Sequence, residues 1–460
     1  MMAIGTNWIS DWNPEDQKFW ESKGKFIARR NLIWSIFAEH LGFSIWLIWS
    51  IVATKLPQAG FHYTTDQLFQ LVALPGLIGS LMRFPYTFAV ARFGGRNWTI
   101  FSASALFIPV IALSYFVTKP DTPFWLMLLV AATAGLGGGN FASSMTNISF
   151  FYPDRMKGWA LGLNAAGGNI GVSSVQLLTP ILLGVGFMNL YLGQPSSGGF
   201  YLQNAGLMWL LPLAIAVCGA IFFMNNLATA RSTLRDQLAI VRRKHTWIMS
   251  YMYVGTFGSF IGYSAAFPLL IKTQFPEVTI GIAFLGPLVG SLSRPLGGLL
   301  ADKVGGAIVT FWNFIAMGAA TLGVMYFIEA KEFAGFLAMF LIVFITTGVG
   351  NGSTYRMIPS IFREEKLREA TEGKMAKSLA LKVASIESGA ALGFIGAIGA
   401  CGGYLIPRGF GASIAATGGP YLALEIYLTF YATCLVLTWW YYLRKAPLTS
   451  GAPSLAQARV

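Results

Sequence analysis

Two arginines, Arg83 and Arg294, stand inside long apolar stretches of this chain. A charged side chain in the middle of an apolar span costs about 2.5–3.5 kcal/mol on insertion scales. Snorkelling to the surface is the structural alternative, but each arginine precedes the next turn by about nine residues, roughly 13 Å of helix. A guanidinium is always charged and presents a planar fork of donors that suits an oxyanion. The two arginines therefore predict a site for a small anion.

The two arginines occupy equivalent places in an internal repeat. Each lies 12 residues before the second of two adjacent glycines. A glycine-rich run begins 52 residues after Arg83, at Gly135, and another begins 54 residues after Arg294, at Gly348. Internal repeats of this kind are typical of secondary transporters. We therefore interpret the chain as two copies of one unit, joined by a basic segment over residues 226–246.

The elements that position these residues are predicted to be membrane-spanning helices. Of the 460 residues, 55% are hydrophobic and 11% are charged, whereas soluble domains carry about 25% charged residues. A span needs about 20 mostly apolar residues. Twelve such runs are present: 31–53, 66–90, 98–117, 123–152, 158–188, 205–225, 247–272, 279–301, 307–328, 334–362, 380–405 and 421–443. We expect an all-α membrane protein built from two pseudo-symmetric six-helix bundles.

The distribution of Lys and Arg predicts the orientation. With the N-terminus inside, 24 basic residues fall on the cytoplasmic side and five on the outer side, as the positive-inside rule requires. The net charge of +13 then reflects topology and not a nucleic-acid surface. Both termini are predicted to be cytoplasmic. The expected organisation is a cytoplasmic segment (1–30), a first bundle (31–225), a basic linker (226–246), a second bundle (247–443) and a cytoplasmic tail (444–460).

The glycines of the two glycine-rich runs are predicted to pack helices closely and to let them slide during gating. They are Gly135, Gly137, Gly139, Gly348, Gly350 and Gly352. A phosphate-binding loop is the alternative, but neither run ends in Gly-Lys-Ser/Thr and both lie inside apolar spans. Small residues let helix backbones approach in a membrane.

Cysteine and histidine usage predicts neither a metal site nor a cofactor. Cys218, Cys401 and Cys434 lie in apolar stretches and match no zinc or disulfide spacing, so we expect them to be buried. His62 and His245 are expected in loops. With no Gly-x-Ser-x-Gly motif either, an enzyme is not predicted.

Four further charged or titratable groups lie in or near the spans. Glu39 and His40 are adjacent in the first span, where they are candidates for a proton relay. The alternative is structural: an ion pair for Glu39 and a single hydrogen bond for His40. Arg356 and Glu387 lie near the cytoplasmic ends of their helices, either as a gate pair or as solvated ends.

The repeat, the central linker and the motif Gly298-x-x-x-Asp302-Lys303-x-Gly305-Gly306 resemble the major facilitator superfamily. The first repeat lacks the Asp, so the gating contact of that Asp is not expected there. The segments Gly135–Pro153 and Gly348–Pro359 are similar to the paired signatures of the nitrate/nitrite porter family and its NarK-type bacterial members. The similarity runs nearly end to end, through Thr65–Leu68, Gly162–Asn164 and Thr256–Phe260.

The resemblance implies the residues that contact substrate. They are Arg83 and Arg294, the amide of Asn169, the hydroxyl of Tyr253, and an aromatic frame of Phe43, Phe141 and Phe257. Two charges, two neutral donors and apolar walls that exclude water form a sensible anion site. The resemblance departs at Glu39 and His40, where the better-known exchangers have apolar residues.

The resulting prediction is a monomeric secondary transporter of nitrate and nitrite in the bacterial cytoplasmic (inner) membrane, without a cofactor. Two coupling modes are open. Nitrate/proton symport would use Glu39 and His40, and we favour it. Electroneutral nitrate/nitrite antiport would need only the two arginines. A membrane enzyme, an anion sensor and a sugar or drug carrier are weaker alternatives. An enzyme would need clustered catalytic or ligand residues, a sensor would need a long soluble output domain, and a sugar or drug carrier would need a larger and more varied polar lining.

Overall fold

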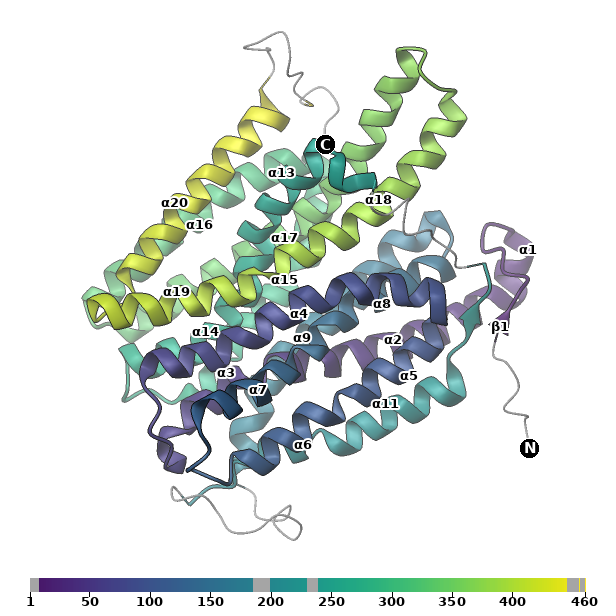
Figure 1. The fold of residues 1–460 in the computed structure, drawn as a ribbon. Coiled ribbons are helices and arrows are strands. Elements are labelled where there is room, and N and C mark those ends of the chain that lie inside the picture. The colour runs from purple at the N-terminus through teal and green to yellow at the C-terminus, as the bar shows by residue number, and fades with distance from the viewer. Residues whose placement is uncertain (1–7, 185–198, 230–238, 445–454, 456–459) are drawn as a thin grey trace. The chain divides into compact units, whose positions relative to one another are not determined.

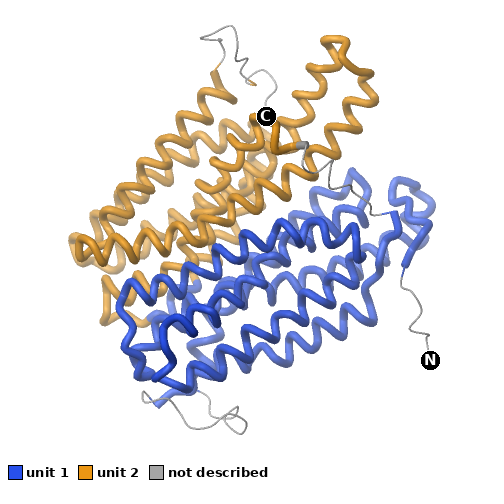
Figure 2. Tube along the Cα trace, viewed as in Figure 1, with its two compact units in different colours: residues 1–232, 280–284 blue, residues 233–279, 285–460 orange. Residues whose placement is uncertain are grey.

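The fold is all-helical apart from one short strand pair. The computed structural model describes residues 8–184, 199–229, 239–444, 455 and 460. In this part of the chain, 12 helical segments are long and apolar enough to cross a membrane, which confirms the number of predicted spans. The chain divides into two compact units, residues 1–232 with 280–284 and residues 233–279 with 285–460 (Figure 2).

The first unit contains the elements of the first repeat (Figure 1). They are β1 (Trp8–Ile9), α1 (Gln17–Phe19), η1 (Trp20–Gly24), α2 (Lys25–Trp46), α3 (Trp49–Lys55), η2 (Pro57–Ala59), α4 (Thr65–Phe93), α5 (Gly95–Ala105), α6 (Phe107–Phe116), α7 (Phe124–Ala134), α8 (Leu136–Phe151), α9 (Asp154–Leu183), α10 (Asn204–Leu207), α11 (Leu210–Phe223) and β2 (Asn226–Leu227). Helix α8 packs against both α2 and α4, and α2 packs against α9. The predicted anion-binding residues of the first unit, Phe43, Arg83, Phe141 and Asn169, lie on these four helices.

The second unit repeats this arrangement (Figure 1). Its elements are η4 (Ala239–Arg242), α13 (Lys244–Tyr253), η5 (Val254–Gly258), α14 (Ser259–Gln274), α15 (Leu285–Val304), α16 (Gly306–Glu329), α17 (Phe333–Thr371), α18 (Lys377–Ala400), α19 (Gly402–Thr417), α20 (Tyr421–Thr438) and η7 (Trp439–Leu443). Helix α17 packs against α15, α16 and α18, and η5 is a π-helical turn between α13 and α14.

The N-terminal segment is folded onto one end of the first unit. Two of its tryptophans, Trp12 and Trp20, join a buried cluster with Phe151 and Tyr152 at the end of α8. The Trp12 indole donates a hydrogen bond to the carbonyl of Phe150 at 3.1 Å. Strand β1 pairs in parallel with β2, which begins the segment between the units. The basic residues Arg231, Arg235, Lys445 and Arg459 lie outside the described residues.

Helical structure extends beyond three of the predicted spans. Helical structure begins at Gln17, α17 continues to Thr371, and α19 continues to Thr417. The added residues at the ends of the first and tenth spans are rich in Lys, Glu and Arg, which are good helix formers but end an apolar run. Arg408, which lies beyond the predicted eleventh span, is within α19 and not in a loop.

Candidate functional site

Arg83 is buried within the first unit, where a carbonyl and two aromatic rings hold its side chain. Its side chain is 0% exposed, and its Nε donates to the carbonyl of Gly138 on α8 at 3.1 Å. The guanidinium carbon lies 4.6 Å from the ring centroid of Phe141 and 5.3 Å from that of Trp46. These contacts orient the guanidinium plane and give the cation partial stabilisation through cation–π attraction.

Trp46 reaches this position because α4 and α8 carry glycines beneath it. Its indole donates to the carbonyl of Pro75 at 2.7 Å. A Cβ on Gly79 would collide with the indole ring, and a Cβ on Gly138 would lie 2.8 Å from it. Trp46 was missed in the sequence. It stands three residues after Phe43, and that spacing places both rings on one helix face.

The structure brings Phe43 and Phe141 together and places Asn169 on the neighbouring helix. The Phe43 and Phe141 rings meet edge to face with centroids 6.0 Å apart. Asn169 lies on α9 with 1% of its surface exposed. Among the described residues, its side-chain amide has no hydrogen-bond partner at either atom. Buried amides are nearly always hydrogen-bonded, so this one is suited to a ligand.

In the second unit, Arg294 is linked to the predicted aromatic residues through Tyr355. Arg294 is 6% exposed, and its guanidinium carbon lies 5.4 Å from the Tyr355 ring centroid. The Tyr355 ring lies 6.1 Å from that of Tyr253, which stacks on Phe257 at 5.3 Å. The Tyr253 hydroxyl donates to Oδ1 of Asn351 at 2.8 Å.

Tyr355 and Asn351 were also missed in the sequence. They stand four residues apart in and after the second glycine-rich run, and this spacing places them on one face of α17. Tyr253 immediately precedes the π-helical turn η5, and Phe257 lies within it. Such turns occur frequently at functional sites because they shift the helix face that follows them.

Glu39 is buried at the centre of a polar cluster in the first unit. Its Oε2 accepts a hydrogen bond from Nδ2 of Asn164 on α9 at 2.6 Å. His40 points to a different part of α9, with Nδ1 3.0 Å from the carbonyl of Gly167. A carbonyl only accepts, so Nδ1 carries the proton. Both side chains therefore contact the helix that carries Asn169.

The six glycines of the two glycine-rich runs all lie at close helix contacts. A Cβ on Gly137 would meet the carbonyl of Gly42, and one on Gly352 would meet the carbonyl of Arg294. The corresponding neighbours are Ile78 for Gly135, Tyr86 for Gly139, Gly290 and Ser293 for Gly348, and Asn313 for Gly350. The runs therefore let α8 and α17 lie directly against the helices that carry the arginines.

The interpretation of Arg356 and Glu387 as a pair is wrong. Arg356 is half-exposed and forms an ion pair with Asp302 of the glycine motif on α15. In the first repeat, Ala91 stands eight residues after Arg83, as Asp302 does after Arg294. The ion pair therefore has no counterpart there. Arg356 is solvated, as the alternative predicted, but it lies within α17 and not at its end.

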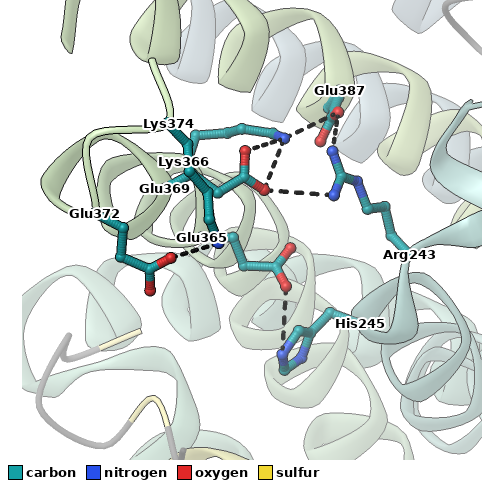
Figure 3. Close-up of polar contacts among 8 residues, drawn as sticks. All are labelled: Arg243, His245, Glu365, Lys366, Glu369, Glu372, Lys374 and Glu387. Carbon is teal, nitrogen blue, oxygen red and sulfur yellow. Dashed lines mark hydrogen bonds and ion pairs between the residues drawn. The ribbon is translucent and has the colours of Figure 1, made fainter. Parts of the chain in front are cut away.

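Glu387 is instead part of a buried ionic network in the second unit (Figure 3). Its Oε1 lies 2.7 Å from Arg243 and 3.5 Å from Lys366, and both cations also pair with Glu369. Partial burial lowers the pKa of Arg243, but the hydrogen bond and charge of Glu387 and the charges of Glu369 and Glu365 outweigh it. The pKa of Arg243 therefore lies above its ordinary value. The alternative prediction, that Glu387 is a solvated helix end, is also wrong.

Two other expectations are corrected. His245 lies in α13 and not in a loop, with its Nδ1 2.9 Å from the hydroxyl of the buried Tyr442. Cys434 is buried as expected, whereas Cys218 is exposed on α11, because a face of a spanning helix that meets lipid is also apolar. Among the described residues no group of three His, Cys, Asp or Glu side chains could hold a metal ion.

Comparisons with known proteins agree with the helical repeat and with the anion chemistry. Residues 32–371 match the family model of the Major Facilitator Superfamily. The chain is 45% identical over 448 residues to the nitrate/nitrite transporter NarU of Salmonella typhimurium, covering 95% of this chain and 97% of that relative. It is 37% identical over 459 residues to the probable nitrate/nitrite antiporter NarK2 of Thermus thermophilus, covering 96% and 98%. The crystal structure of a D-xylose-proton symporter matches 92% of this chain and 98% of that chain, with a TM-score of 0.62 and 16% identity.

Proposed function

The chain belongs to the Major Facilitator Superfamily and, within it, to the nitrate/nitrite transporters, and from this premise we propose that it holds its anion between Arg83 and Arg294. It is a multi-pass membrane protein of the bacterial cytoplasmic membrane, and it moves nitrate and nitrite by alternating access. The single observation that carries this proposal is that each unit buries one arginine at the equivalent repeat position, with its guanidinium beside an aromatic ring.

The two arginines suit a planar oxyanion. Nitrate and nitrite place two oxygens at a spacing similar to that of a carboxylate, so a guanidinium can donate to both at once. Burying a guanidinium is unfavourable unless opposite charge and hydrogen bonds offset the loss of water. Two such cations directed at one site repel, and a bound anion removes that repulsion. Anion binding therefore favours closure of the carrier around its substrate.

The remaining predicted contacts complete the site. The amide of Asn169 supplies a neutral hydrogen-bond donor, and the hydroxyl of Tyr253 supplies a second when it turns from Oδ1 of Asn351 to the anion. Phe43, Phe141 and Phe257 supply apolar walls. An apolar surrounding strengthens each charged hydrogen bond because it excludes water. Trp46 and Tyr355 join the walls, since each lies beside one of the arginines.

Coupling to protons is the mode we favour. Glu39 is a carboxyl group with 1% of its surface exposed, on the same helix as Phe43. Titratable groups within spans are costly and mark proton pathways. In the symport cycle, the loaded carrier reorients with Glu39 protonated and His40 assists the proton transfer. Electroneutral nitrate/nitrite antiport by the same arginines is the alternative, in keeping with the name of the Thermus thermophilus relative.

Proteoliposomes that contain a pH-sensitive dye test both levels of the proposal. Nitrate is added outside vesicles that are either empty or loaded with nitrite. Acidification of the empty vesicles supports symport, and nitrate entry only into nitrite-loaded vesicles without a pH change supports antiport. Failure of nitrate to enter either preparation would contradict the transport function itself. Retention of nitrate binding after both arginines are replaced by Gln would contradict the binding site.

A further inference from the structure

A chain of buried hydrogen bonds leads from Glu39 across three helices of the first unit. Nδ2 of Asn164 donates to Oε2 of Glu39 and to Oγ of Ser144, both at 2.6 Å. Oγ of Ser144 lies 2.8 Å from Oγ of Ser35, which is on α2 one turn before Glu39. All four side chains are buried. The hydrogen bonds join α2, α8 and α9 through their buried polar side chains.

The orientation of the Asn164 amide matches an ionised Glu39. A side-chain amide nitrogen has two hydrogens, and here one goes to the carboxylate and the other to the serine. Oδ1 of Asn164 is buried and has no hydrogen-bond partner in the part of the chain that the structure describes. A protonated Glu39 must instead donate to an acceptor. The nearest way to supply one is a half-turn of the amide, which exchanges its nitrogen and its oxygen.

The hydroxyl groups of Ser35 and Ser144 can reverse the direction of their hydrogen bond when the Asn164 amide turns. Either hydroxyl of the Ser35–Ser144 pair can be the donor. With Glu39 ionised, Ser144 accepts from Asn164 and donates to Ser35. With Glu39 protonated and the amide turned, Ser144 donates to Asn164 and accepts from Ser35. The chain of side chains therefore has two hydrogen-bonding arrangements that differ by one proton and one amide rotation.

We propose that Asn164 is a positioning residue that senses the charge of Glu39 and transmits it through α9 to the substrate-binding amide of Asn169. This inference rests on the proposed symport function and deepens it. The structure supports the transmission step through three contacts around Asn169. Glu39 lies directly against the backbone of Gly168, His40 bonds to the carbonyl of Gly167, and Ser44 donates to the carbonyl of Gly171 at 2.9 Å.

These contacts make α9 sensitive to the first span. A Cβ on Gly168 would collide with the Glu39 carboxyl. At this position the backbone of α9 therefore lies directly against the Glu39 side chain of α2. A rearrangement of hydrogen bonds at Glu39 therefore acts on the backbone one residue before Asn169. A shift of this kind changes the position of an amide that must meet the anion within hydrogen-bond distance.

Other titratable groups on the packed helices are more remote or already engaged. They are Asp154, Arg155 and Lys157 on α9, Asp66, Arg83, Tyr86 and Arg92 on α4, Arg96 on α5, Cys218 on α11, Glu21 and Lys23 on η1, and Lys25, Arg29 and Arg30 on α2. Helix α8 has none. The α9 charges precede Asn164 by at least seven residues, which is about 10 Å of helix. The Nε of Arg83 is bonded to Gly138. His40 is the titratable neighbour of Glu39 and belongs to the same relay.

The test is the pH profile of nitrate-driven uptake in proteoliposomes. Asn164→Leu removes the hydrogen bond that stabilises the ionised carboxylate. Its half-maximal point should therefore move to higher pH by about one to two units, the equivalent of a hydrogen bond to a charged group. The matched control is Asn204→Leu, a buried asparagine that donates to the carbonyl of Leu182 at the far end of α9. The control should keep the wild-type profile.

The possible outcomes separate the inference from the function on which it rests. A shifted profile in Asn164→Leu, with the control unshifted, supports the inference. Equal profiles in the wild type and in Asn164→Leu overturn it and leave symport intact. Nitrate entry into wild-type vesicles without any proton movement overturns symport, and with it this inference.

Infrared spectroscopy of the purified protein keeps the inference testable if Asn164→Leu does not fold. Acidification of the wild type should produce a carboxylic C=O band that is absent from Glu39→Gln. With labelled asparagine, the same acidification should change a side-chain amide band that is absent from the isosteric variant Asn164→Asp. A carboxylic band from Glu39 without any change in that amide band would overturn the inference.

Discussion

Replacing Arg83 with Lys separates the charge of the site from its geometry. Lysine keeps the positive charge but lacks the planar fork, and it cannot reproduce the bond from Nε to the carbonyl of Gly138. That bond uses one of the five guanidinium N–H groups and fixes the plane of the rest beside Phe141. The variant therefore loses both the fork and the contact that directs it.

The expected loss of nitrate affinity follows from the lost hydrogen bond. A hydrogen bond to a charged group contributes about 1.5–3 kcal/mol. Losing one of the two parallel bonds to the anion should raise the dissociation constant by roughly 10- to 150-fold. The cation–π contact with Phe141 adds little to this difference, because an ammonium group also interacts with a ring.

Calorimetric titration of the detergent-solubilised protein with nitrate measures this effect directly. The matched control is Arg96→Lys in the same unit, where the guanidinium also bonds to a backbone carbonyl, that of Ile221, at 2.7 Å. Arg96 lies near the start of α5, outside the proposed site. Its replacement should leave the nitrate affinity within about twofold, because surface changes act within roughly 0.5 kcal/mol.

A dissociation constant for Arg83→Lys within threefold of the wild type would refute the paired geometry. Charge alone would then account for binding, and the fork would have no role. An equal loss in Arg83→Lys and Arg96→Lys would also refute it, because the loss would then follow from any change of Arg to Lys at a buried carbonyl. Arg294→Lys should behave as Arg83→Lys does.

Three further predictions concern stability and gating. Gly352→Ala should abolish nitrate uptake and lower the melting temperature, because the new methyl group meets the carbonyl of Arg294 on α15. Trp12→Ala should lower the free energy of unfolding by about 3 kcal/mol, as buried aromatic truncations do, and a thermal melt would measure it. Glu387→Gln should also lower the free energy of unfolding, by about 1.5–3 kcal/mol, because it removes one of the two carboxylates that Arg243 and Lys366 share and leaves them paired with Glu369, again measured by a thermal melt.

Each of these variants has a matched control in the same chain. Gly298→Ala adds a methyl group where no described atom lies within 4 Å. Trp8→Ala removes a tryptophan that is 44% exposed. Glu21→Gln breaks an exposed ion pair with Lys25, which contributes about 0–1 kcal/mol. If a variant and its control were to melt at the same temperature, the contact assigned to that variant would not contribute to stability.

The repeat made much of the fold predictable. In both halves an arginine stands 12 residues before a glycine turn, and a glycine-rich run begins 52 or 54 residues after the arginine, which indicates two similar bundles. Apolar length alone gave the number of spans, which is confirmed. The length of an apolar run does not predict where a helix ends when the helix continues into charged residues. Residues 363–371 continue α17 as charged helix, because helix propensity and hydropathy are independent properties of Glu, Lys and Arg.

The sequence could not predict which side chains from distant parts of the chain would come into contact. The arginines were visible because a charge in a span is unusual. Trp46 and Tyr355, which lie beside them, look like any other aromatic residue of a membrane protein. Glu387 was treated as a helix end because its partner Arg243 is 144 residues away and lies just outside an apolar run. Only the folded chain shows that this carboxylate is buried between two cations.

The repeat also allows the polar side chains of the two halves to be compared. Glu39 stands four residues before Phe43, and Tyr253 stands four residues before Phe257, so the two occupy equivalent positions. Each bonds to a buried asparagine on a neighbouring helix, Glu39 to Asn164 and Tyr253 to Asn351. In the proposed symport, Glu39 gains and loses a proton in the first half, while the Tyr253 hydroxyl donates to Asn351 in the second. This difference would give two otherwise similar halves the asymmetry that the proposed proton coupling requires.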